Sequence, residues 1–468
     1  MIKLKSNLLF FMGLFLCANI FAFDIKSNYE DRKSLDLTIY SNNMAFVKEV
    51  RQVKFPKDIS NLCLQDIPYS LIPNSIFLVS LNYPKDFEIL EQEYRYDLGS
   101  NNDLLNKFIG KEVKVVKFSD ISADMYEQKA VLLKAGQSKI LSIDNEIYLN
   151  FPGEIVVNSE NVITKPCVSA KCEVVRSKSH EILISYLVDN MNWDAGYNLF
   201  IKKNDRADLK SWMNITNNSG LDYTDANIKV IAGDVKREEA GSSRYRGFLM
   251  KAAVSPDAAN AATFREKAVS QYYSYEIPYK TSINNGSTKQ ISFLDLKDLE
   301  IQEKLVLKNR GIYLFTRYRD PVEKEYFDNN VKIKNTTESN LPKGNIRVYK
   351  QIEKNNVEFI GESSINNTAK DEEIEITLGK SFDVYAKRKQ MDYKKISNNI
   401  HVSEWQIKIF NKKDKVIRVE VVDFLSGDWN IMDNNTKYKK LTSSSIKFDL
   451  NIKPNSEVII KYSVKTKV

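Results

Sequence analysis

Apolar and polar residues alternate with a period of two along most of the chain. The alternation is clearest in the C-terminal third, in residues 373–378, 405–409, 417–421, 446–453 and 458–464. A period of two is typical of strands that bury one face and expose the other. Strands of this kind pair antiparallel and pack as sandwiches rather than as parallel α/β sheets. The pattern therefore predicts a mainly β protein of antiparallel β-sandwich-type domains with very little helix.

Helical character is confined to short segments. Residues 101–110 predict one short helix, with Ser100 or Asn101 as its N-cap and Gly110 as its stop. A second stretch of good helix formers, 257–271, has no clean apolar stripe and lies within the polar segment 236–271. Loops of this length are unusual unless they are functional or disordered. We therefore expect 236–271 to be a mobile loop and a candidate for partner binding.

A denser series of short strand-like segments follows the first helix. Turns at Ala135-Gly136 and Asp144-Asn145 separate these segments, which predicts a small β-barrel-like insert. The predicted organisation is a signal peptide at 1–22, an N-terminal β region at 23–110, the insert at 111–165, a central β domain at 166–330 and a C-terminal β-sandwich at 331–468.

The first 22 residues have the pattern of a secretory signal. A basic start precedes the apolar run 8–21, and the small residue Ala22 favours cleavage directly after it. The run is shorter than the roughly 20 apolar residues that a bilayer span needs. A lipoprotein signal ending at Cys17 and an uncleaved anchor are the alternatives. Since no second apolar stretch of spanning length follows, we expect an exported protein without a transmembrane span, in the periplasm or peripheral to the outer membrane.

The composition limits the chemistry. The chain of 468 residues has a net charge of +8 but only two His and four Cys, and it contains no Walker A, HExxH, GxGxxG or GxSxG motif. His180 and His401 precede strand-like segments without a nucleophile or metal context. Many Lys residues alternate with apolar ones, which indicates a solvated sheet face rather than a nucleic-acid-binding stripe. We expect no metal, no cofactor and no nucleic acid, and we lean towards a non-enzymatic protein.

Three cysteines remain after signal cleavage. Cys167 and Cys172 flank Val-Ser-Ala-Lys, a spacing that suits a bridge across a tight turn in an oxidising compartment. Metal binding is the other interpretation, but no His or second Cys pair lies nearby to complete four ligands. The sequence predicts a Cys167–Cys172 disulfide, and Cys63 as a small buried apolar residue.

Two acids stand in distinctive surroundings. Asp194 lies in NWDAGY and Asp222 in SGLDYTDA. A pair of carboxylates at the right separation is enough for glycoside hydrolysis. Asp194 before Ala-Gly also suits a turn, and Asp222 follows Gly220 at a predicted hairpin. We favour the structural interpretation for both acids.

Aromatic residues gather near these acids. Trp193, Tyr197, Trp212 and Tyr223 could stack on sugar rings, but on strands such residues more often fill the core between sheets. We therefore expect them to be core residues.

Residues 186–235 resemble the central part of the family called domain of unknown function 4139, which also occurs in mucoidy-inhibitor-A-like proteins. The match consists of Trp193, Tyr197, the turn Asn218-Ser219-Gly220 and the pair Asp222-Tyr223. Further similar segments are 37–55, 71–79, 272–294, 341–350, 359–368 and 376–384. Tyr223 stands where Trp is common in the family, and the coiled coil of many relatives is missing.

The resemblance implies a mostly β, exported protein with no catalytic residues to carry over, so the motif residues are expected to be structural. The most consistent function is a binding or scaffolding module of the bacterial envelope, with an envelope protein or a glycan as partner. A carboxylate-dependent enzyme that processes envelope glycans and a host-contacting surface protein are the alternatives.

Overall fold

The computed structural model describes residues 23–467 apart from 119–124, 152, 234, 236–264, 270–271, 310–313, 318–322 and 354–355. Strands dominate these residues, and most neighbouring strands pair antiparallel. The predicted mainly β class is therefore confirmed. The described parts of the chain form two compact units, one within residues 1–192 and 216–288 and the other within 193–215 and 289–468. The predicted central domain, 166–330, contributes strands to both.

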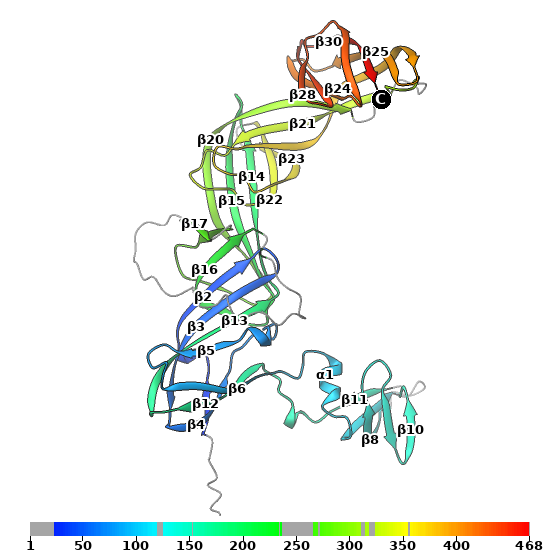
Figure 1. Cartoon of the computed structure of the whole chain (residues 1–468). Helices are drawn as coiled ribbons and strands as arrows, with labels where there is room; N and C mark the ends of the chain where they lie inside the picture. The colour runs from blue at the N-terminus through cyan, green and yellow to red at the C-terminus, as the bar shows by residue number, and fades with distance from the viewer. Residues whose placement is uncertain are drawn as a thin grey trace, which may run out of the picture. The chain divides into compact units, whose positions relative to one another are not determined.

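An eight-stranded sheet forms the centre of the first unit (Figure 1). Its strands in spatial order are β17 (Arg265–Val269), β18 (Tyr272–Glu276), β16 (Tyr223–Ala232), β2 (Arg32–Tyr40), β3 (Met44–Phe55), β13 (Lys178–Asp189) and β5 (Phe77–Ser80), with β19 (Thr281–Ile283) beside β16. β2 and β16 pair parallel although almost 200 residues separate them. Alternate residues of β2, β3 and β13 are buried, as the period of two predicts.

A four-stranded sheet lies in the same unit. Its order is β1 (Phe23–Ser27), β4 (Asp58–Leu64), β12 (Cys167–Val174) and β6 (Phe87–Arg95). Short 3-10 turns occur at Tyr29–Asp31, Pro73–Ser75 and Ser159–Asn161. The predicted loop 236–271 falls largely outside the described residues, as does most of the second predicted helix. Residues 265–269, which belong to both the predicted loop and the predicted helix, instead form strand β17 and pair with β18.

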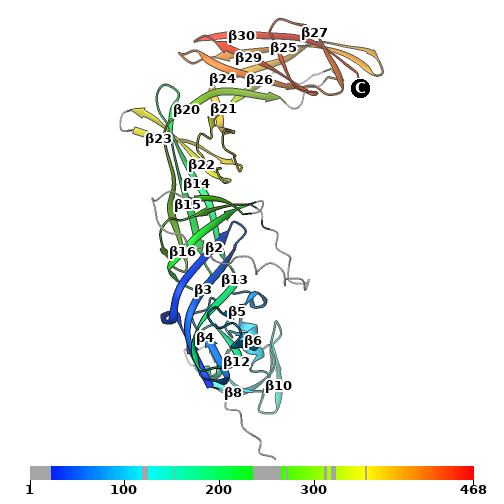
Figure 2. The ribbon, with the colours of Figure 1, turned by 60° about the vertical axis from the view of Figure 1, so that its left-hand side comes forward.

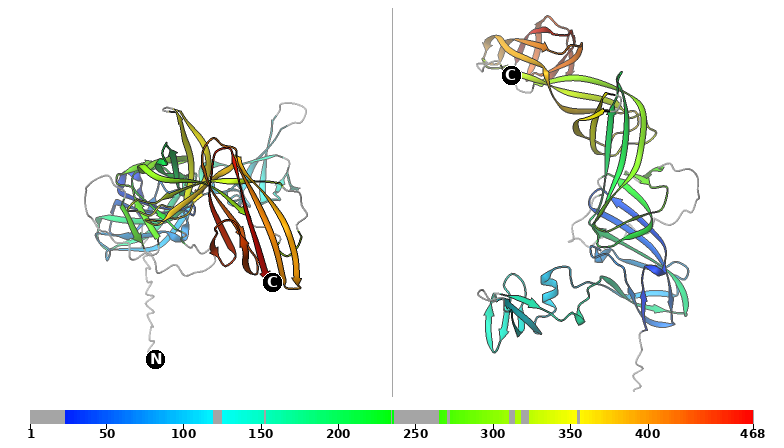
Figure 3. Two further views of the ribbon diagram at one scale, coloured as in Figure 1. Left: turned by 90° about the horizontal axis from the view of Figure 1, so that it is seen from above. Right: turned by 180° about the vertical axis from the view of Figure 1, so that it is seen from behind.

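The insert is an open sheet and does not close into a barrel. Its order is β10 (Glu146–Leu149), β9 (Ile140–Ile143), β8 (Met125–Lys134), β7 (Glu112–Phe118) and β11 (Glu154–Val156). The insert is the cyan part of the chain in Figure 3. The helix α1 (Asn101–Asn106) begins where it was predicted, because the Ser100 hydroxyl accepts the Asp103 N–H. Leu105 of α1 and nearby Phe108 share a small core with Val115, Leu132 and Leu141 of the sheet.

The second unit is built on one branched sheet. Its main path is β23 (Asn356–Ile365), β22 (Gly344–Glu353), β14 (Met191–Ile201), β15 (Arg206–Asn217), β20 (Ser287–Asn309), β21 (Lys324–Lys334), β24 (Glu373–Ser397), β25 (Ile400–Asn411), β30 (Ser456–Lys467) and β27 (Asp428–Asn434). A branch from β20 contains β26 (Ile417–Phe424), β29 (Ser445–Ile452) and β28 (Lys439–Thr442).

The C-terminal strands form a sandwich, as predicted (Figure 2). Its core joins Trp405 and Ile407 of β25, Val421 of β26, Phe448 of β29 and Ile460 of β30, all buried. Because β20 also contributes Leu305 and Leu307, the sandwich extends beyond the predicted boundary at 331.

Candidate functional site

The aromatic residues of the family-like motif are buried. Trp193 and Tyr197 lie on β14, and Tyr223 begins β16. The Tyr197 hydroxyl donates to the carbonyl of Pro342 at 2.7 Å. Burial raises the pKa of Tyr223, so its hydroxyl stays protonated, 3.4 Å from Ser219 Oγ. None of these three rings offers an exposed face to a sugar. Trp212 of β15, also predicted to be a core residue, is only partly buried.

Asp194 and Asp222 each accept a hydrogen bond from a neighbouring segment of the chain. Asp194 lies within strand β14 rather than at a turn, so the turn interpretation was wrong, and its carboxylate accepts from Asn214 Nδ2 at 2.8 Å. Asp222 directly precedes β16 and accepts the backbone N–H of Asn285 at 2.7 Å. Asn285 in turn accepts the N–H of Gly220 through its side-chain oxygen. Each carboxylate therefore has a structural partner within its own unit.

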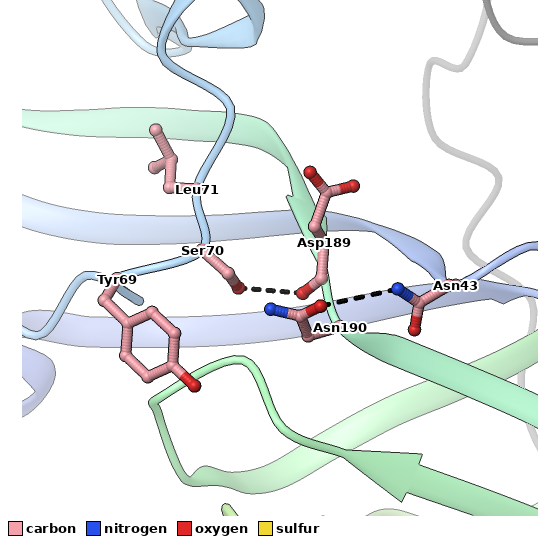
Figure 4. Close-up of a pocket in the computed structure, with 6 residues that line it drawn as sticks. All are labelled: Asn43, Tyr69, Ser70, Leu71, Asp189 and Asn190. Atoms are coloured by element: carbon pink, nitrogen blue, oxygen red, sulfur yellow. Dashed lines mark hydrogen bonds between the residues drawn. The ribbon is translucent and has the colours of Figure 1, made fainter. Parts of the chain in front are cut away.

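A shallow, open hollow of about 510 Å³ lies in the first unit (Figure 4). Its lining comes from the β2–β3 turn, the β13–β14 turn and the segment before the 3-10 turn at 73–75: Asn43, Tyr69, Ser70, Leu71, Asp189 and Asn190. Ser70 Oγ donates to the Asp189 carbonyl at 2.7 Å, and Asn43 Nδ2 donates to Asn190 Oδ1. These bonds hold loops together, and the hollow lacks a nucleophile–base pair.

Tyr69 closes one side of this hollow. Its hydroxyl donates to the Asn218 carbonyl at 2.9 Å, and its ring lies against Gly220, whose φ is +94°. A Cβ at Gly220 would lie 1.9 Å from the Tyr69 ring. The turn Asn218-Ser219-Gly220, which we call the motif turn, therefore contacts Tyr69 in the wall of the hollow.

The structure contains a buried contact between Ser80 and His180 that the sequence did not predict. Ser80 Oγ lies 2.9 Å from His180 Nδ1, although the two residues are 100 positions apart. Phe55, Tyr83 and Phe87 surround the His180 ring, and burial lowers the pKa of this imidazole. Both side chains are buried, so substrate has no access and the contact is a packing feature. No sequence motif marks it.

Asp86 near this contact does not complete a catalytic triad. Both of its carboxylate oxygens accept from Arg176, at 2.9 and 3.0 Å. That bidentate pair is the main cause that lowers the pKa of Asp86. His180 therefore receives no orienting hydrogen bond from this acid.

The predicted Cys167–Cys172 bridge is wrong. Both residues lie in the single extended strand β12 and are free thiols. Their spacing along a strand puts their Cα atoms about 16 Å apart, whereas a disulfide needs less than about 7 Å. Cys172 faces the core, where burial raises the pKa of its thiol to about 12. Cys63, predicted to be buried, is half-exposed.

The outer face of the insert sheet exposes a row of apolar side chains. Ile147 and Leu149 of β10 are 65% and 71% exposed, and Val131 and Leu133 of β8 are also exposed. Ser142 of β9 lies opposite both Ile147 and Val131, so these residues form one continuous surface. We call Val131, Leu133, Ile147 and Leu149 the insert patch.

Charged residues border the insert patch on the same face. Lys129 bonds Glu112 and Lys114 bonds Glu127, each at 2.8 Å, across β7 and β8. The opposite face of the sheet carries the small core with α1. An apolar surface rimmed by charges is typical of a protein-interaction site.

Within the residues that the structure describes, no group of three or more His, Cys, Asp or Glu is arranged to hold a metal ion. In the same part of the chain, no helix has the length and apolarity needed to cross a bilayer.

Comparison with known proteins gives no match, either to a protein-family model or to a curated protein. The resemblance of residues 186–235 to domain of unknown function 4139 therefore stays a hypothesis.

Proposed function

We propose that this chain is an exported, non-enzymatic binding protein of the cell envelope, and that the insert patch is where a partner protein docks. The observation that carries the proposal is the exposure of Val131, Leu133, Ile147 and Leu149 on one face of a sheet whose other face has its own core. When a partner covers exposed apolar area, the complex is stabilised by about 25 cal/mol per Å² of area buried.

The chemistry of the insert patch favours a protein over a glycan. Its side chains are aliphatic and supply no hydrogen-bond donors for sugar hydroxyls, while the Glu112–Lys129 and Lys114–Glu127 pairs at its edge offer charges of both signs. Interfaces between proteins commonly combine an apolar centre with a polar rim. The hollow beside Tyr69 is open and polar, and its side chains already bond one another or nearby backbone carbonyls.

Export rests on the signal-like pattern of residues 1–22. Phe23, the first residue after the proposed cleavage site, is also the first residue of β1. The intact mass of the protein recovered from cells tests this point. A chain that begins at Phe23 supports cleavage after Ala22, whereas a mass that retains the first 22 residues contradicts it.

Crosslinking in intact cells tests the binding proposal. A tagged full chain is compared with the Ile147→Lys/Leu149→Lys variant, and crosslinked peptides are identified by mass spectrometry. We expect one recurrent partner crosslinked next to β8 or β10, with at least tenfold less captured by the variant.

Phe382→Lys is the matched control, because Phe382 of β24 is 87% exposed and lies in the other unit. Circular dichroism checks that both variants fold. If the folded Ile147→Lys/Leu149→Lys protein captures its partner as well as wild type does, the insert patch is not the docking site. Retention of a glycan in place of a protein would contradict the proposed partner class.

A further inference from the structure

Two cysteines lie diagonally opposite each other on neighbouring strands of the four-stranded sheet. β4 and β12 run antiparallel with Ser169 opposite Cys63. Cys167 precedes Ser169 by two positions, and therefore its side chain points to the same side of the sheet as that of Cys63. Both thiols are half-exposed, whereas Cys172 on the alternate face is buried.

The two thiols are close enough to interact. Cys63 is one of the neighbours that raise the pKa of the Cys167 thiol, as expected from their places in the strand register. Diagonal neighbours on an antiparallel pair have Cα atoms roughly 7–8 Å apart with closer Cβ atoms, and disulfides need about 4.4–6.8 Å. Cys167 is the first residue of β12, and it pairs with Arg95 of β6 but with no residue of β4. A small shift of the chain entering this strand therefore closes the gap without breaking the β4–β12 ladder.

We infer that Cys63 and Cys167 form a cross-strand disulfide when the folded chain meets a thiol oxidant. Each thiol gives up one proton and one electron, and a bond forms between the two sulfur atoms. The oxidant is of the disulfide class, either oxidised glutathione or a disulfide-carrying oxidoreductase, and its S–S bond is reduced to two thiols. The pairing follows from the strand register alone, while its occurrence in cells rests on the export proposed above.

A Cys63–Cys167 bridge would join the two ends of the long segment between β4 and β12. Residues 65–166 connect β4 to β12, and this segment contains α1 and the insert sheet. A covalent link across so long a loop strongly restricts the unfolded chain and therefore stabilises the folded one. The bridge would thus secure the attachment of the segment that carries the insert patch.

The surroundings of Cys167 favour a structural bridge over an exchange-active one. Burial, followed by the neighbouring Cys63, raises the pKa of Cys167 to about 11. A thiol with a raised pKa is rarely a thiolate at neutral pH and is a poor leaving group. Once formed, the bridge is therefore expected to resist small thiols.

Disulfide mapping of the purified full chain tests the inference. The protein is incubated with oxidised glutathione, alkylated, digested without reductant and analysed by mass spectrometry. We expect a linked peptide pair containing Cys63 and Cys167, with a higher melting temperature than the reduced protein. The Cys63→Ser and Cys167→Ser variants should lose the linked pair, and Cys172→Ser should keep it.

Two results would overturn the pairing: full alkylation of both thiols after oxidation, or links that join different chains or use Cys17 or Cys172 instead. The same mapping on protein from intact cells separates the two proposals. A bridge that forms with glutathione but is missing in cells contradicts export to an oxidising compartment and leaves the pairing intact.

Discussion

Asn335 and Asn411 make the same set of hydrogen bonds where β21 and β25 end. The side-chain oxygen of each accepts a backbone N–H two residues on, from Thr337 and Lys413 respectively. The side-chain nitrogen of each donates to a carbonyl four residues on, at Ser339 and Lys415. Both asparagines are buried, and each also donates to carbonyls of a neighbouring segment.

Asn217 at the end of β15 repeats this arrangement in the motif turn. Its oxygen accepts the Ser219 N–H at 3.1 Å, and its nitrogen donates to the carbonyls of Leu221 and Ile283. In each case one amide satisfies backbone groups that lose their ladder partners where the strand ends. Three strand ends therefore share one structural device.

Replacing Asn411 by Ala should lower the free energy of unfolding by about 3 kcal/mol, because the carbonyls of Lys415, Ile452 and Lys453 lose a buried donor. Urea denaturation measures the change. Asn399→Ala is the control, since Asn399 is exposed, and it should change stability by less than about 0.5 kcal/mol. Equal stability of the two variants would contradict a structural role for the Asn411 amide.

Gly220→Ala should be more destabilising than Gly286→Ala. Both positions have positive φ, +94° and +70°, so both variants incur backbone strain of about 1–2 kcal/mol. A Cβ at Gly220 also meets the Tyr69 ring, whereas a Cβ at Gly286 has nothing within 4 Å. Adding Tyr69→Ala should therefore recover part of the loss in Gly220→Ala and none in Gly286→Ala. A double-mutant cycle without coupling between positions 69 and 220 would refute the contact.

Asp423→Ala should destabilise the C-terminal sandwich by about 3–5 kcal/mol. It leaves the buried Arg388 guanidinium with Glu325 as its remaining acidic partner, and it removes the acceptor of the buried Tyr462 hydroxyl. The Arg388→Met/Asp423→Leu variant removes both buried charges and should recover part of the loss, since only the partly exposed Glu325 and the Tyr462 hydroxyl lose a partner. Thermal and urea unfolding compare the variants. Arg347→Ala, which breaks the exposed pair with Glu362, should have an effect below about 1 kcal/mol. A double variant no more stable than Asp423→Ala would argue against the buried pair as the cause.

Stability should fall as the pH drops below the ordinary His pKa of 6.5, because burial lowers the pKa of His180 in the folded chain. Just below that pH, His180 is protonated in the unfolded chain but still neutral in the folded chain. This contribution is thus complete above about pH 6.5 and is lost as the pH falls through the lowered folded value.

His180→Asn keeps an acceptor near the Nδ1 position that faces Ser80 and cannot titrate in this range. Urea unfolding from pH 5 to 8 should therefore show a shallower pH dependence for this variant than for wild type. Identical slopes would show that another group causes the acid sensitivity.

Local patterns were sufficient wherever near neighbours decide the structure. The alternation at 405–409 predicted β25, and Ser100 predicted the start of α1 through its hydroxyl. Asp144 and Asn145 predicted the β9–β10 turn, and both adopt positive φ. In each case the favourable interaction lies within a few residues of its cause.

Pairings between distant segments were not predictable in this way. The register of β4 and β12 places Cys167 near Cys63 instead of Cys172, and packing brings Ser80 to His180. The parallel pairs β2–β16 and β20–β26 likewise join strands more than 100 residues apart. Side-chain periodicity indicates which face of a strand is buried, but it does not indicate which strands pair with its two edges.

The sequence by itself thus determined the β class, the alternating faces and the local turns and cap, because these follow from backbone preference and side-chain period. Only the tertiary structure decided which cysteines lie near each other, the contact of Gly220 with Tyr69, and the exposure of Ile147 and Leu149. These depend on strand register and on which faces the fold leaves uncovered, and both are set by long-range packing.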